Sequence, residues 1–132
     1  MIKDYKTWKN AVINNGIVTF SPFSESAESK RYQLYAMDNQ YPINYENIDE
    51  TFKEIYNDIL IPLFNGDLPH ADDPQYAQNL FVVSEIVDSL VFVSYTYAFD
   101  DVETAREFAK IVDADDIYDT VDEDTINLYS PN

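Results

Sequence analysis

The residues of this sequence that could do chemistry are mostly carboxylates. Four of them recur at every fourth position: Glu46, Glu50, Glu54 and Asp58. On a helix this spacing places the side chains on one face, about 6 Å from one to the next. Like charges at this distance repel each other, and only Lys53 lies among them to offset the repulsion. The spacing therefore predicts a column of negative charge along one helix.

A second concentration of carboxylates lies toward the C-terminal end. Positions 100 to 124 hold 11 acids and only two bases, Arg106 and Lys110. We expect part of this stretch to join the helical column in contacting a basic partner. Tyrosine suits such a contact because its ring stacks on arginine and contributes strongly to protein interfaces. The expected contact residues here are Asp113, Asp115, Asp116, Tyr118, Asp119, Asp122 and Glu123.

The sequence contains no recognisable set of catalytic residues. The one histidine, His70, lies in a loop-like segment without a serine or cysteine nucleophile motif, and the chain has no cysteine. With only two glycines, a glycine-rich loop that cradles phosphate is excluded as well. We expect no enzyme activity, no catalytic residue and no cofactor.

Metal binding by carboxylates is the remaining chemical alternative. Asp113, Asp115 and Asp124 have part of the spacing of a calcium-binding loop. However, Ile117 and Tyr118 occupy the fifth and sixth positions, where such a loop requires an oxygen ligand and a glycine. We expect no specific metal site, and a carboxylate-dependent metal binder or enzyme stays open as a further alternative.

The charge of the whole chain limits the kinds of partner. The 25 acids and 8 bases give a net charge of −17 over 132 residues. Such a field repels nucleic acids and anionic membranes and attracts cationic surfaces. We therefore expect a basic protein as partner, with no direct binding of nucleic acid or membrane. Because the sequence shows no cysteine and no apolar run of signal-peptide or membrane-spanning length, we also expect a cytoplasmic protein.

Three helices that could position the acids are predicted from apolar residues at helical spacing. They cover residues 5–13, 45–60 and 100–112. The second has Asn47 as its expected N-cap, and Pro62 followed by Asn65-Gly66 marks its expected end. The third is expected to begin after Asp100 as N-cap.

Four strands are predicted from runs of β-branched and aromatic residues: residues 17–23, 31–38, 80–87 and 90–99. The last two flank Asp88-Ser89 and predict a hairpin, in which alternate residues from Val91 to Phe99 share one face. Apolar residues in the tail 113–132 indicate that it docks at least partly. We expect one α+β domain over residues 1–132, an antiparallel meander sheet of about four strands with two to three helices packed on one face.

In charge, size and carboxylate columns the chain resembles phage-encoded acidic nucleic-acid mimics of the anti-restriction and anti-CRISPR type. The resemblance rests on composition and on the segments Glu46–Asp58 and Asp100–Asp124, and no ordered motif of a specific family is matched. It implies a non-catalytic inhibitor whose carboxylates stand in for phosphates. The implied target is a basic enzyme, an RNA-guided nuclease or a restriction enzyme, whose DNA or RNA site is blocked.

Other interpretations of the acidic surface stay open. An immunity protein or antitoxin that neutralises a basic toxin would use the same charge complementarity, in a compact patch. The acids could also form a charged, hydrated surface that has no partner. The sequence leaves the identity of the partner and the oligomeric state open.

Overall fold

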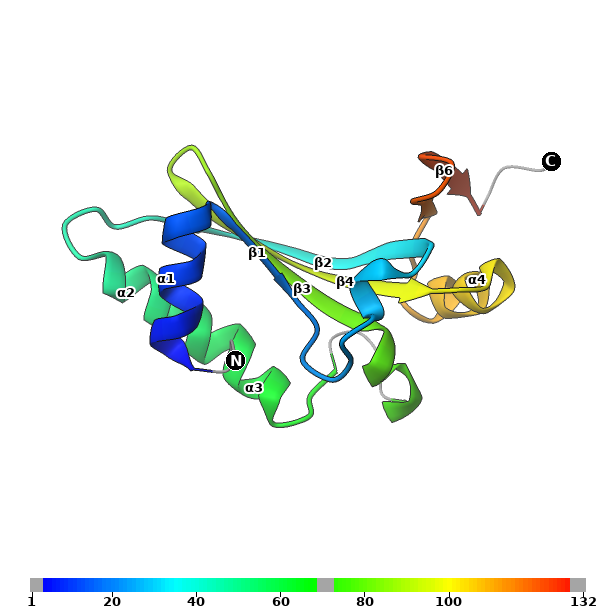
Figure 1. The fold of residues 1–132 in the computed structure, drawn as a ribbon, viewed down its shortest axis with the longest axis horizontal. Helices are drawn as coiled ribbons and strands as arrows, with labels where there is room; N and C mark the ends of the chain where they lie inside the picture. The colour runs from blue at the N-terminus through cyan, green and yellow to red at the C-terminus, as the bar shows by residue number, and fades with distance from the viewer. Residues whose placement is uncertain (1–3, 69–72, 129–132) are drawn as a thin grey trace.

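The computed structural model describes residues 4–68 and 73–128, and its centre is an antiparallel sheet (Figure 1). Within these residues the sheet has six strands in the order β1-β3-β4-β2-β5-β6. The strands are β1 (Ile17–Phe20), β2 (Tyr32–Pro42), β3 (Leu80–Val87), β4 (Leu90–Phe99), β5 (Asp116–Asp119) and β6 (Asp124–Asn127). The α-helices are α1 (Tyr5–Asn15), α2 (Ile48–Ile55), α3 (Ile61–Phe64) and α4 (Val102–Ile111). The predicted α+β class with an antiparallel sheet is confirmed.

The hairpin of β3 and β4 forms the middle of the sheet, and both strands have the bounds predicted from the sequence. Every second residue of β4 points into the core, so the prediction that these alternate residues share a face is confirmed. They are all buried: Val91, Val93, Tyr95, Tyr97 and Phe99. Alternation of this kind is the signature of a sheet with one packed face.

The helices pack on this one face of the sheet. Trp8 of α1 donates a hydrogen bond from Nε1 to Ser84 Oγ of β3 at 3.3 Å. Its ring meets Phe52 of α2 with centroids 5.6 Å apart. At the other end of β4, Phe108 of α4 packs on Tyr97 with centroids 4.4 Å apart. The helices α1, α2 and α3 thus gather under one end of the sheet and α4 lies at the opposite end (Figure 1).

The strand order differs from the predicted meander of about four strands. β2 lies between β4 and β5, and β1 pairs with β3, so chain neighbours are not always sheet neighbours. The two additional strands come from the tail, in which β5 and β6 form a hairpin. Ile117 of β5 is fully buried. The prediction that the tail docks at least partly is therefore confirmed.

Strand β2 is longer than predicted and contains a β-bulge. It pairs with β4 from Tyr32 to Pro42, and the register shifts between Tyr35 and Met37. Leu34 and Tyr41 both lie opposite core-facing residues of β4, although they are seven positions apart. An odd separation would place them on opposite faces of a regular strand, so the extra residue of the bulge is needed.

Two helix boundaries differ from the sequence prediction. The helix that begins after Asn47 passes through a π-helical turn, η2 (Tyr56–Leu60), and continues in α3 beyond Pro62. The predicted end at residue 60 is four residues too early, because proline is tolerated in the first turn of a new helical segment, but the helix does end before Asn65-Gly66 as predicted. The N-cap of α4 is Asp101, not Asp100: its Oδ2 accepts a hydrogen bond from Thr104 N at 3.0 Å. Across residues 4–68 and 73–128, no helix is long and apolar enough to cross a membrane.

Candidate functional site

Exposed carboxylates dominate the described surface. Residues 4–68 and 73–128 contain 24 of the 25 acids, and 21 of these are exposed, all except Asp49, Glu85 and Asp119. Within this part of the chain four acids form ion pairs with lysine or arginine: Asp49, Glu103, Asp119 and Asp122. The other 20 therefore have no lysine or arginine partner there, and 19 of them are exposed to water.

The predicted helical column is shorter than its sequence spacing indicates. Glu50 and Glu54 lie one turn apart on α2, and both are exposed. Glu46 precedes the helix, in a turn where its backbone N–H donates to Asn44 Oδ1 at 3.1 Å. Asp58 lies four residues after Glu54, in the π-helical turn η2 that continues α2, and it is exposed as well. We call these four exposed acids the α2 group.

Part of the α2 group concentrates its charge near the end of β2. Burial raises the pKa of the Tyr41 hydroxyl, and the negative charges of Asp58 and Glu54 raise it further. Both carboxylates must therefore lie close enough to act on the same hydroxyl. Asp58 and Glu54 thus form a local cluster of negative charge beside Tyr41.

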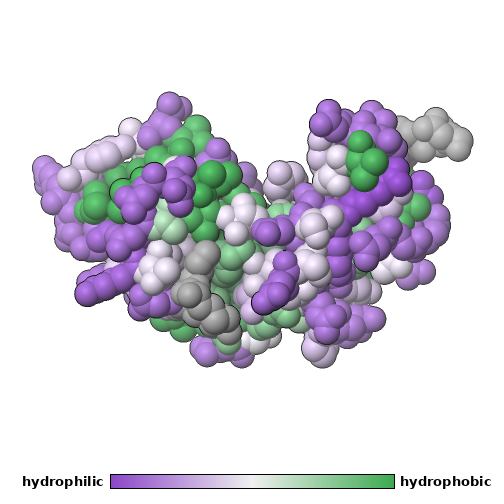
Figure 2. Space-filling model, viewed as in Figure 1, coloured by the Kyte–Doolittle hydropathy of each residue, from purple (hydrophilic) through white to green (hydrophobic). Residues whose placement is uncertain are grey.

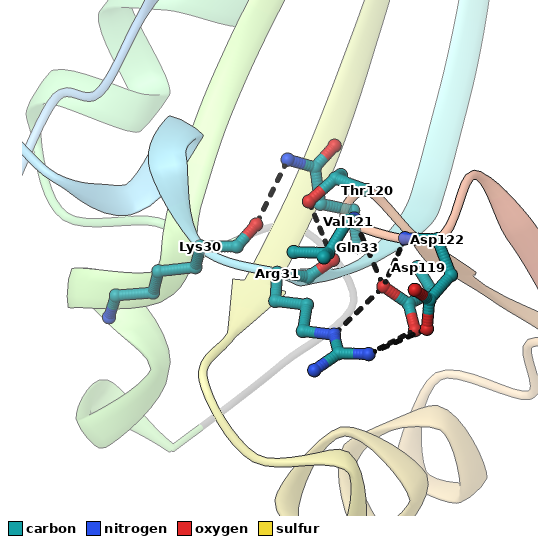
Figure 3. Close-up of polar contacts among 7 residues, drawn as sticks. All are labelled: Lys30, Arg31, Gln33, Asp119, Thr120, Val121 and Asp122. Carbon is teal, nitrogen blue, oxygen red and sulfur yellow. Dashed lines mark hydrogen bonds and ion pairs between the residues drawn. The ribbon is translucent and has the colours of Figure 1, made fainter.

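Two of the predicted contact acids, Asp119 and Asp122, are paired with Arg31 of the same chain (Figure 3). The guanidinium donates from Nε and Nη2 to the two carboxylate oxygens of Asp119, both at 2.9 Å, and from Nη2 to Asp122 Oδ2 at 2.8 Å. Asp119 Oδ1 also accepts backbone N–H bonds from Val121 and Asp122.

The hydrogen bonds from Arg31 lower the pKa of Asp119 to about 2. Asp119 is 5% exposed, whereas the side chain of Asp122 is 57% exposed. Asp119 thus anchors the β5–β6 turn to Arg31, directly before β2. We leave Asp119 and Asp122 out of the candidate contact surface.

The remaining predicted acids of the tail are exposed. Asp113 follows α4 in a left-handed conformation with φ 57°, and Glu123 lies in the β5–β6 turn with φ 56°. Asp115 and Asp116 lie at the start of β5, where Tyr118 is 39% exposed. We call Asp113, Asp115, Asp116 and Glu123 the tail group. Because α2 and the β5–β6 hairpin lie at opposite ends of the sheet, the structure does not join the two groups in one row (Figure 1).

The segment with partial calcium-loop spacing forms a β-hairpin in the structure. Ile117 points into the core, and its cross-strand partner is Ile126. Nowhere in residues 4–68 and 73–128 do three or more His, Cys, Asp or Glu side chains gather closely enough to hold a metal ion. His70 lies outside the described residues, so its position as a loop histidine stays a prediction.

Asp49 is a charged contact that the sequence did not reveal. Its Oδ1 accepts hydrogen bonds from the Tyr5 hydroxyl at 2.7 Å and from Lys9 Nζ at 2.6 Å. The bond from Lys9 is the main reason that the pKa of Asp49 lies below its ordinary value, and the Tyr5 bond adds to it. The contact ties α1 to α2, and no sequence signal indicates it because the partners are 40 or more positions apart.

Comparisons with known proteins give no relative for this chain. No protein-family model, no curated protein and no solved structure matches it. We therefore infer a function from the charges and contacts of the chain itself.

Proposed function

We propose that this chain is a non-catalytic protein that binds a basic nucleic-acid-binding protein and blocks its DNA or RNA site with carboxylates in place of phosphates. The observation that supports the proposal is the excess of unpaired charge. Of the 24 acids in the described residues, 20 have no lysine or arginine partner there. Unpaired surface charges attract an opposite surface over long distances and steer its approach.

The placement of the acids favours an extended cationic groove over a compact cationic patch. The α2 group and the tail group lie at opposite ends of one sheet (Figure 1). Duplex DNA presents its charge along a line, and the proteins that bind it present lysine and arginine along a matching groove. A surface with carboxylates at both ends suits such a groove better than the small site of a toxin, so we place the nucleic-acid mimic ahead of an immunity protein.

The mode of action follows from charge density and rigidity. The net charge of −17 is spread over 7661 Å² of accessible surface, about 450 Å² for each uncompensated charge. Glu50, Glu54 and Asp116 lie on a helix and a strand that share one core, so their spacing is preserved on binding. A cationic groove that accepts this surface loses access to its own nucleic acid.

Neutralising the acids tests the proposal. The contact variant carries Glu50→Gln, Glu54→Gln, Asp113→Asn, Asp115→Asn and Asp116→Asn. We expect the wild-type chain to inhibit cleavage by at least one enzyme in a panel of restriction and RNA-guided nucleases. The contact variant should inhibit that enzyme about tenfold less strongly or worse, because the opposing Lys and Arg lose their partners.

A matched control separates position from net charge. The control variant neutralises five exposed acids elsewhere: Glu25, Glu28, Asp67, Asp73 and Asp88. Its net charge equals that of the contact variant, and we expect it to retain most of the inhibition. Equal loss in both variants would contradict a defined contact surface, and the absence of inhibition of any nuclease by the wild-type chain would contradict the proposed function.

A further inference from the structure

The face of the sheet opposite the helices is covered only in part. A short 3₁₀ turn, η1 (Ala27–Ser29), packs Ala27 against Phe81 and Ala98 on this face. Beyond that contact, large side chains stay open to water. Tyr35 is 71% exposed, Ile17 46% and Val87 39%. An antiparallel sheet can leave one face hydrated, but polar residues then usually alternate with the buried ones.

Two adjoining grooves lie on this face, one on each side of Tyr35. The first, of about 500 Å³, is lined by Tyr35, Asp38, Glu85, Val87, Phe92 and Ser94. The second, of about 310 Å³, runs toward the β5–β6 hairpin and is lined by Gln33, Tyr35, Asp116, Tyr118 and Thr125. Figure 2 shows the molecule hollowed between the end with the β3–β4 turn and the end with β6. We call the two grooves together the saddle.

The saddle is aromatic and acidic at once. Tyr35 stands between the grooves, Phe92 lies in the first and Tyr118 in the second. Each groove also contains carboxylates, Asp38 and Glu85 in the first and Asp116 in the second. Neither groove is lined by a lysine or arginine, and none of these three acids forms an ion pair in the part of the chain that the structure describes. A ligand that satisfies this surface must bring positive charge.

Arginine fits this combination better than any other side chain. Its planar guanidinium stacks on aromatic rings and donates two parallel hydrogen bonds to a carboxylate, whereas lysine offers a compact charge that does neither as well. The chain already contains one such arrangement. Arg31 lies over the Tyr32 ring, 5.1 Å from its centroid, while it bonds both oxygens of Asp119.

A second copy of this chain does not fit the saddle. It would bring the same carboxylates and the same charge of −17 toward each other, and like charges in contact are strongly unfavourable. We propose that the saddle binds an arginine-bearing segment of the basic partner, with an arginine stacked on Tyr35 and paired to Asp38, Glu85 or Asp116. This inference rests on the proposed function and adds the place at which the partner is held.

The test uses a short arginine-rich peptide and a lysine-substituted peptide of equal charge as probes. Affinity is measured by fluorescence anisotropy for the wild-type chain and for Tyr35→Ala. We expect the wild-type chain to prefer the arginine peptide, and Tyr35→Ala to lose about tenfold in affinity for it and to bind both peptides alike. Tyr35→Phe should retain the preference because it keeps the ring.

The matched control is Tyr45→Ala. Tyr45 is 66% exposed and lines neither groove, so its removal should leave the preference for arginine unchanged. Thermal unfolding confirms that each variant is folded. Equal affinities of Tyr35→Ala and Tyr45→Ala for the arginine peptide would overturn the saddle proposal. Failure of the proposed function is seen separately, as the absence of nuclease inhibition by the wild-type chain.

Discussion

At the scale of single residues, Arg31 determines which carboxylates of the tail are paired within the chain. It bonds both oxygens of Asp119 and one oxygen of Asp122, and it thereby anchors the β5–β6 turn. The backbone of the turn reinforces the contact, since Thr120 donates from N and Oγ1 to the carbonyl of Arg31. The acids that stay free in the tail are those that Arg31 does not reach.

The contact predicts a dependence of stability on pH. The pKa of Asp119 falls from its ordinary 3.8 to about 2 in the folded chain. A lowered pKa stabilises the folded state above about pH 4, and this stabilisation is lost as the pH falls toward 2. We expect Asp119→Asn to lower the urea midpoint at pH 7, and the difference from wild type to vanish near pH 2. Asp122→Asn, at a more exposed site, should have the smaller effect, and a pH-independent gap for Asp119→Asn would contradict this account.

At the scale of elements, local sequence signals predicted the parts of the fold that depend on neighbours along the chain. The bounds of β3 and β4 follow from two β-branched runs around one turn, and α1 follows from its apolar spacing. The predicted start of α4 was correct within one residue, since the N-cap is Asp101 and the predicted N-cap was Asp100. These features need no information about distant residues.

The features that the sequence did not predict depend on contacts between distant residues. The β5–β6 hairpin lacks a strong strand pattern of its own and is fixed by Ile117 in the core and by Arg31, 88 positions before Asp119. The π-turn at Tyr56–Leu60 has no distinct sequence signal. The saddle was missed because it combines side chains from β2, β3, β4, β5 and β6, and only the sheet order brings them together.

Docking of the hairpin can be measured through its buried side chain. Ile117→Ala removes a fully buried residue, and we expect it to lower the free energy of unfolding by about 3 kcal/mol. Val121→Ala lies in the turn at 67% exposure and should change it by less than about 0.5 kcal/mol. Urea denaturation at neutral pH measures the free energy of unfolding of both variants and of the wild-type chain. Equal small effects would mean that the hairpin is not part of the folded core.

At the scale of the whole molecule, the fold keeps most of its charge unpaired. Carboxylates gather at both ends of the sheet, and more carboxylates accompany the aromatic rings of the saddle on the face opposite the helices (Figures 1 and 2). Mutual repulsion of these charges works against the compact state, so a core with large aromatic residues such as Trp8, Tyr97 and Phe108 must offset it. A cationic surface in contact with these carboxylates would relieve part of the repulsion.

Salt dependence combined with competition tests the central claim most directly. The affinity of the wild-type chain for an enzyme that it inhibits is measured at increasing salt, and then in the presence of duplex nucleic acid. The account predicts that the logarithm of the association constant falls steeply with the logarithm of the salt concentration, and that duplex and chain exclude each other from the enzyme. An affinity that is insensitive to salt, or a complex that holds chain and duplex together, would contradict it.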